Sequence, residues 1–303
     1  MMAEAHWTQV CTSFYAGDFP TTLKHAQIGW NHHEVESSIE YAKFTQQNSG
    51  PLNLSNLGLA LWQLGYAQQG IAKVHEALQL SIDLKHVFTQ AVMEWMVAQV
   101  YEFALMGDKA VEYGQRCRRI GNEQAFAMWQ GMGNGIIGIG LKQQGQYDEA
   151  VERLTEGISI IESTTARICM AKYKGHLADA LWKNGQRSLA LDKLEQAFES
   201  QKTGEYFTHA ELLRFRGDFA YDSGQHDQAE LHYNESIRVA IGQGAKFYEL
   251  RTTSRLCRLW EQQGKGQLAR QKLESLLSGF TEGFEMPDLQ EARTLLVKLN
   301  RNT

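Results

Sequence analysis

The sequence GQYDEAVERLTEGI, residues 145–158, has four other copies along the chain. They are GYAQQGIAKVHEAL at 65–78, GQRSLALDKLEQAF at 185–198, GQHDQAELHYNESI at 224–237 and GKGQLARQKLESLL at 264–277. Each copy begins with a glycine, has a small residue five positions later and a larger apolar residue four positions after that. Steps of four and three place these residues on one face of a helix.

The residues before each glycine show a second helix. Seven positions before it the residue is small, as at Gly58, Gly138, Ala178, Gly217 and Cys257. Small residues let two antiparallel helices approach closely, and the glycine accommodates the turn between them. The repeated unit is therefore a helix pair.

Weaker copies start at Gly17 and Gly107, the latter out of register by about two residues, which makes about seven pairs. The turn glycines are 48, 42, 38, 40, 39 and 40 residues apart. We expect the surplus over a period of about 34 residues to lengthen the second helix or the turn between repeats. Pro287, Asp288 and an apolar face with Leu289 and Leu295 predict a C-terminal capping helix over 286–303.

The small–large–glycine–small order resembles the tetratricopeptide repeat (TPR), which implies an all-α solenoid of antiparallel helix pairs, a single domain over 1–303. Residues 244–296 and 51–76 also resemble the helical C-terminal tail of bacterial signalling proteins that carry a nucleotide cyclase and a P-loop ATPase domain. The chain has no Gly-x-x-x-x-Gly-Lys-Ser/Thr loop and no cyclase-like carboxylate pair, so neither activity is implied. Both a fragment of such a protein and a free-standing relative fit.

Composition narrows the function classes. The net charge of −5 does not favour nucleic-acid binding, and no stretch is apolar enough to predict a membrane span. The four cysteines are scattered, which indicates neither a zinc site nor disulfides and favours a cytoplasmic location.

Two motifs suggest sites but have simpler explanations. Gly133-Asn-Gly135-Ile-Ile-Gly138 matches a dinucleotide-binding pattern, yet no strand precedes it, so close helix packing is favoured. His32 and His33 are adjacent and point to different sides of a helix, which predicts a solvated linker over a metal site. We expect no catalytic residues, no metal and no cofactor.

The first helix of each pair should line the concave surface of a TPR-like array. We predict that a protein or peptide partner in bacterial signalling binds this groove, with an apolar part in the first half and an acidic part in the second. The predicted groove residues are Trp62, Tyr101, Lys142, Lys172, Trp182, Arg214, Tyr221, Arg251 and Arg258. The alternative for these residues is that the tryptophans pack between repeats and the charges pair internally, as Arg214 and Asp218 could. The alternative function is a small-ligand sensor whose glycine-rich middle, Met132 to Ile139, encloses a metabolite.

Overall fold

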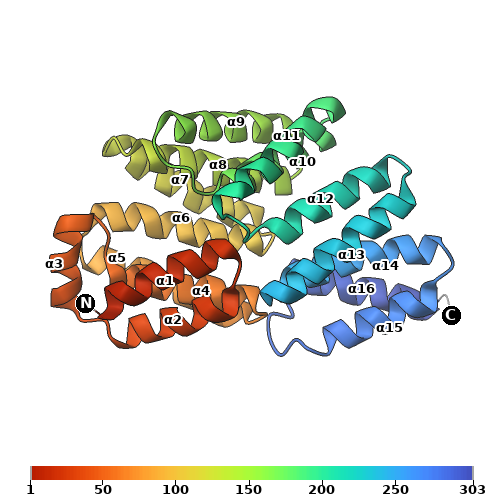
Figure 1. The fold of residues 1–303 in the computed structure, drawn as a ribbon, viewed down its shortest axis with the longest axis horizontal. Helices are drawn as coiled ribbons and strands as arrows, with labels where there is room; N and C mark the ends of the chain where they lie inside the picture. The colour runs from red at the N-terminus through yellow and green to blue at the C-terminus, as the bar shows by residue number, and fades with distance from the viewer. Residues whose placement is uncertain (1, 302–303) are drawn as a thin grey trace.

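A computed structural model describes residues 2–301, which form α-helices joined by short turns, and no strand occurs among them (Figure 1). The all-helical fold class is confirmed. The helices are α1 Met2–Ala16, α2 Phe19–Asn31, α3 Val35–Thr45, α4 Ser49–Gln63, α5 Ala67–Asp83, α6 Val87–Phe103, α7 Gly107–Glu123, α8 Ala127–Gln143, α9 Tyr147–Ser163, α10 Met170–Lys183, α11 Arg187–Ser200, α12 His209–Asp222, α13 His226–Gln243, α14 Lys246–Gln262, α15 Gly266–Leu277 and α16 Pro287–Arg301.

Within the described residues, seven antiparallel pairs run from α1/α2 to α14/α15, with α3 inserted after the first pair. The helices α5 to α9 have 17 residues each, so the surplus over the 34-residue period is shared by both helices of a pair. The expectation of a longer second helix holds for α12/α13, with 14 and 18 residues, but not for α6/α7 and α8/α9, whose two helices are equal in length. The last helix, α16, begins at the predicted Pro287 and packs on α14 and α15.

The turn residues show why one repeat was placed in the wrong register. Left-handed backbone conformations recur every 20 residues, at positions 65, 85, 105, 125 and 145. In the third pair the turn residue is Leu105, with φ +57°, and Gly107 is the first residue of α7. Gly107 is therefore not the turn glycine. Tyr101, the groove residue predicted on α6, was counted from Gly107 and so lies two residues from the equivalent position counted from Leu105.

Helix packing in the middle of the array depends on glycine. A Cβ at Gly157 would lie 2.7 Å from the backbone nitrogen of Gly135, and a Cβ at Gly131 would lie 3.0 Å from the carbonyl oxygen of Gly157. The backbones of α8 and α9 thus touch without side chains between them. The 133–138 motif lies inside α8, which confirms its interpretation as a close-packing element.

The array of helix pairs curves round until repeats that are far apart in the sequence come into contact (Figure 1). The Trp62 ring on α4 stacks on Phe247 of α14, with ring centroids 4.5 Å apart. The backbone carbonyl of Tyr15, at the end of α1, accepts hydrogen bonds from the backbone N–H groups of Tyr206 at 2.6 Å and Phe207 at 3.1 Å. These contacts divide the concave side into an apolar pocket and a charged interior.

Candidate binding site: an apolar pocket on the concave side

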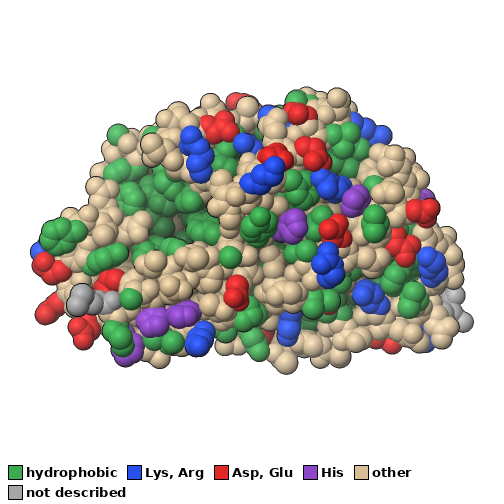
Figure 2. All heavy atoms as spheres, viewed as in Figure 1, with side chains coloured by type: hydrophobic (Ala, Val, Ile, Leu, Met, Phe, Trp, Pro, Cys, Tyr) green, Lys and Arg blue, Asp and Glu red, His purple; other side chains and the backbone are tan. Residues whose placement is uncertain are grey.

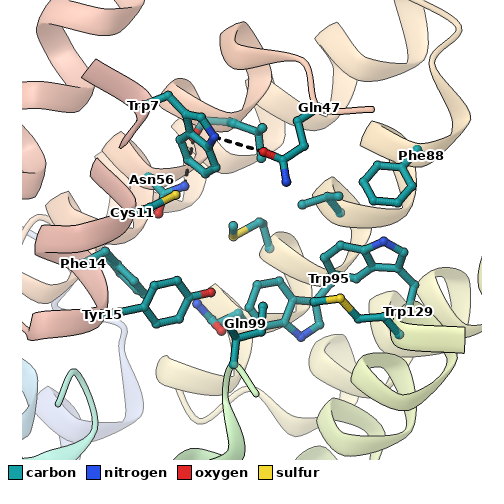
Figure 3. A pocket seen from close by; sticks show the side chains of 15 residues that line it. Trp7, Cys11, Phe14, Tyr15, Gln47, Asn56, Phe88, Trp95, Gln99 and Trp129 are labelled. Atoms are coloured by element: carbon teal, nitrogen blue, oxygen red, sulfur yellow. Dashed lines mark hydrogen bonds between the residues drawn. The ribbon is translucent and has the colours of Figure 1, made fainter. Parts of the chain in front are cut away.

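The apolar pocket is a cavity of about 340 Å³ between α1, α4, α6 and α8. Figure 2 shows a hollow lined with hydrophobic side chains on one face of the molecule. In Figure 3 the side chains from α1 lie opposite Phe88, Trp95 and Trp129. The lining residues are Trp7, Cys11, Phe14, Tyr15, Gln47, Leu52, Asn56, Phe88, Val92, Trp95, Met96, Gln99, Met128, Trp129 and Ile168.

The lining of the pocket carries no charge at neutral pH. None of its residues is Asp, Glu, Lys, Arg or His. Burial raises the pKa of the Cys11 thiol to about 12, and burial also raises the pKa of Tyr15 well above its usual value. Both side chains are therefore protonated, and the pocket suits an uncharged ligand because a charge placed here would lose its hydration.

Three amide side chains are among the polar groups of the pocket. Gln47 accepts a hydrogen bond from the Trp7 indole at 3.2 Å, and Asn56 donates to the carbonyl of Leu52 at 2.9 Å. Gln99 accepts from the ammonium of Lys172 at 3.2 Å. A few placed polar groups in an apolar cavity are typical of sites that orient a ligand.

Contacts between distant helices hold the pocket walls. The Trp95 indole donates to the Tyr173 hydroxyl at 2.8 Å, and that hydroxyl donates to the Met132 carbonyl at 3.1 Å. The Phe14 ring packs against Phe207, with centroids 5.3 Å apart. The pocket is thus formed by fixed side chains of several repeats, which favours a preformed site.

A charged interior lies beyond the floor of the pocket. The Lys172 ammonium pairs with Glu102 at 2.7 Å, and Lys142 pairs with Asp179 at 2.6 Å. Burial opposes ionisation of Glu102, but Lys172 and His176 lower its pKa to about 2. Buried carboxylates and ammonium groups here neutralise one another.

The same pairing extends through α12, α14 and α16. Arg214 contacts Glu211 at 2.6 Å and also pairs with Asp218, as the four-residue spacing suggested. Arg251 pairs with Glu211, contacts Asp288 at 2.8 Å and donates to the Phe103 carbonyl at 2.8 Å. This one guanidinium links α14 to α6, α12 and α16.

The structure places the predicted groove residues in several environments. The two tryptophans pack between repeats: Trp62 is fully buried, and Trp182 stacks on Phe219 at 4.2 Å. Tyr101 lies away from the pocket, where it hydrogen-bonds His75 at 2.8 Å and stacks on Tyr113. The cations Lys142, Lys172, Arg214 and Arg251 are paired as described, and all but Lys172 line a polar cavity of about 180 Å³. Tyr221 and Arg258 border two further clefts. A partner-binding role for these nine residues stays a prediction.

Sequence reasoning missed most of the α6 wall, although a signal for it was present. With Leu105 as the turn residue, the stripe on α6 becomes Val92, Trp95, Gln99 and Glu102. The first three line the pocket and the fourth pairs with Lys172. Counting back from Gly145 in steps of 20 residues leads to this register, because the second step reaches Leu105.

Neither a cluster of metal ligands nor a helix able to span a membrane is found in the part of the chain that the structure describes. Between residues 2 and 301 no cluster of three or more His, Cys, Asp or Glu side chains could hold a metal ion. In the same part of the chain, no helix combines the length and the apolar character that crossing a membrane requires.

The helix pairs and their concave surface define a TPR-like α-solenoid. No family model matches the chain, and no curated protein does. Solved structures with a similar fold include the apo form of RapI, with 14% identity and a TM-score of 0.56 over 98% of this chain and 100% of that one. A Rap protein complexed with Competence and Sporulation Factor has 11% identity and a TM-score of 0.57 over 99% and 98%. The Rap conjugation gene regulator of plasmid pLS20 in complex with the Phr* peptide has 13% identity and a TM-score of 0.57 over 99% and 96%. At these identities the likeness establishes the fold.

Proposed function

We propose that this chain is a non-catalytic binding module that captures a peptide or an extended segment of a protein, and that the apolar pocket anchors it. The observation that carries this proposal is a preformed, uncharged cavity on the concave side of a helical repeat array. Aromatic side chains such as Trp7 and Trp95 are typical of interface hot spots. Two of the solved structures with this fold are complexes, one of them with a peptide.

The proposal changes the predicted division of the groove. The apolar part of the partner binds at Val92, Trp95 and Trp129 instead of Trp62 and Tyr101. An acidic part would have to displace the internal partners of Lys172, Arg214 and Arg251, which are already neutralised. Cationic contacts are therefore assigned to the more exposed Arg258 and its neighbour Arg255, at the edge of the charged interior.

The biological setting belongs to the same proposal. The resemblance of residues 244–296 to the tail of bacterial cyclase and ATPase signalling proteins supports a regulatory role in bacterial signalling. A protein partner, a cytoplasmic location and the absence of catalysis are parts of this proposal.

A small-ligand sensor is the second candidate, because the pocket volume also suits a small apolar molecule. The glycine-rich part of α8 does not enclose such a ligand, since its glycines contact neighbouring helices directly. Any metabolite would occupy the pocket at α1, α4 and α6.

The test uses a random-peptide display library selected on the full chain, followed by affinity measurements on the selected peptides. Val92→Trp should fill the pocket and weaken binding at least about tenfold, because the anchoring side chain loses its buried surface. Val297→Trp, at an exposed position on α16, is the matched control and should bind like wild type. Peptides that bind Val92→Trp as tightly as wild type, with unchanged near-UV circular dichroism, would refute the proposal.

A further inference from the structure

The side-chain amide of Gln99 has one satisfied end and one unsatisfied end. Gln99 is fully buried on α6 and lines the pocket, where Figure 3 shows it beside Tyr15 and Trp95. Its Oε1 accepts from the Lys172 ammonium at 3.2 Å, whereas its Nε2 is buried and has no hydrogen-bond partner. A buried donor without a partner destabilises the fold, so its presence needs a reason.

The orientation of this amide is determined by its neighbour. An ammonium group only donates hydrogen bonds, so the oxygen of Gln99 and not its nitrogen must face Lys172. Lys172 is itself fully buried, paired with Glu102 at 2.7 Å and 5.0 Å from the centroid of the Phe103 ring. The N–H groups of Gln99 are therefore directed away from the Lys172 ammonium, and Gln99 is one of the residues that line the pocket.

The surroundings define what this donor can bind. The pocket lining is apolar and uncharged, so a ligand carboxylate or ammonium would be desolvated without a counter-ion. A neutral carbonyl oxygen is an acceptor that fits an amide donor beside aromatic rings, and the buried indole N–H of Trp129, also in the lining, is a second donor without a partner.

We propose that Gln99 is a specificity-determining residue of the pocket, whose Nε2 donates a hydrogen bond to the carbonyl oxygen of an uncharged, apolar ligand group. The identification of that carbonyl as the main chain of a peptide, next to an apolar side chain, rests on the proposed function. The hydrogen bond itself is a property of the pocket and is tested with small probes.

The experiment titrates the full, isotope-labelled chain with acetophenone, ethylbenzene and benzoate, followed by NMR. Acetophenone carries a carbonyl, ethylbenzene is similar in shape without an acceptor, and benzoate adds a charge. We expect acetophenone to shift the side-chain amide signal of Gln99 and to bind about tenfold more tightly than ethylbenzene, because only acetophenone satisfies the buried donor. Benzoate should bind more weakly than either.

Gln99→Leu removes the donor at nearly constant volume and also identifies the Gln99 signal by its disappearance. In this variant acetophenone and ethylbenzene should bind equally. Gln228→Leu, at an exposed position on α13, is the control and should keep the wild-type preference. The preference of the wild type for acetophenone over ethylbenzene tests the inference even where Gln99→Leu fails to fold.

The outcomes separate this inference from the proposed function. Equal binding of acetophenone and ethylbenzene to wild type, an unmoved Gln99 amide signal, or benzoate binding as tight as acetophenone would overturn the role of Gln99. Selected peptides that lose affinity in Val92→Trp but not in Gln99→Leu would overturn it too, while leaving the pocket as the peptide site. A response to acetophenone with no peptide binding at the pocket would uphold Gln99 and overturn the proposed function.

Discussion

Arg251 is the side chain whose removal should most disturb the closure of the array. Its guanidinium donates to both Asp288 oxygens, at 2.8 and 3.1 Å, and to the carbonyl of Phe103 at 2.8 Å, and it also pairs with Glu211. Arg251→Met keeps most of the apolar stem and removes all of these donors. The variant leaves Asp288 buried without its counter-ion, whereas Glu211 keeps Arg214 at 2.6 Å.

The expected loss follows from these contacts. Removing one partner of a buried ion pair costs about 3–5 kcal/mol, and the stranded Phe103 carbonyl adds about 1 kcal/mol. We therefore expect Arg251→Met to lower the free energy of unfolding by about 4–6 kcal/mol. Adding Asp288→Asn removes the stranded carboxylate and should recover about 2 kcal/mol of this loss.

The loss should also depend on pH. Burial raises the pKa of Asp288 even though Arg251 opposes this shift, so the pKa rises further once Arg251 is gone. A carboxyl group whose pKa is higher in the folded state makes the protein less stable as pH rises, because the group ionises at a lower pH in the unfolded chain. The deficit of Arg251→Met should therefore be larger at about pH 8 than at about pH 5.5, where Asp288 is closer to protonation.

Urea unfolding followed by far-UV circular dichroism measures these differences for the wild type, the two single variants and the double variant. Arg238→Met is the control, because the Arg238 side chain is 76% exposed and its guanidinium lies 3.7 Å from Glu235. This control should change stability little. A deficit below about 1 kcal/mol for Arg251→Met, or no recovery on adding Asp288→Asn, would refute the proposed role of the buried pairs.

Three further predictions concern backbone and burial. Ala125→Gly should stabilise the fold by about 1 kcal/mol, because Ala125 is exposed and has φ +54°, a left-handed conformation that glycine adopts without strain. The control Ala72→Gly, at an exposed position within α5, should cost up to about 1 kcal/mol, and thermal unfolding compares the two variants. Gly157→Ala should cost about 1–3 kcal/mol because its Cβ meets backbone atoms of α8, and Gly242→Ala, with open space around it, should be neutral or stabilising in urea unfolding. Burial raises the pKa of Glu94 to about 7, so the free energy of unfolding of the wild type should fall between about pH 4.5 and 7. Glu94→Gln should therefore be more stable than wild type at about pH 8, by up to about 3 kcal/mol. Unfolding curves of the two proteins at several pH values should show this gain vanish near pH 4.5.

The repeat could be predicted from sequence where glycine occupies the turn, because glycine adopts the left-handed conformation without cost. Lys85, Leu105 and Ala125 have the same left-handed conformation, but their residue types rarely adopt it and therefore do not indicate a turn in the sequence. The search for glycine therefore selected Gly107 in place of Leu105. That displacement of two residues moved Trp95 and Gln99 off the predicted groove, and it put Tyr101 on it.

The closure of the array could not be predicted from the repeat pattern. Local spacing defines which face of a helix is apolar, but the meeting of α4 with α14 depends on the small rotation that each repeat adds. This rotation accumulates until Trp62 reaches Phe247 and Tyr15 reaches Phe207. A residue that a local pattern places on the concave surface is therefore buried when two distant parts of that surface meet.

The pairing of the predicted cations follows from the same geometry. The concave stripe carries carboxylates within reach of its cations: Asp179 on α10 pairs with Lys142 on the adjacent concave helix α8, and Glu102 on α6 pairs with Lys172 on α10, one concave helix further on. Closure buries these charges around a polar cavity of about 180 Å³, and buried charges of opposite sign then form pairs. Paired charges hold the helices together and have little remaining affinity for a partner. The apolar pocket has the larger unfilled volume, about 340 Å³ against about 180 Å³ for the charged cavity, and an unpaired donor at Gln99. For this reason it is the part of the concave surface where we place recognition.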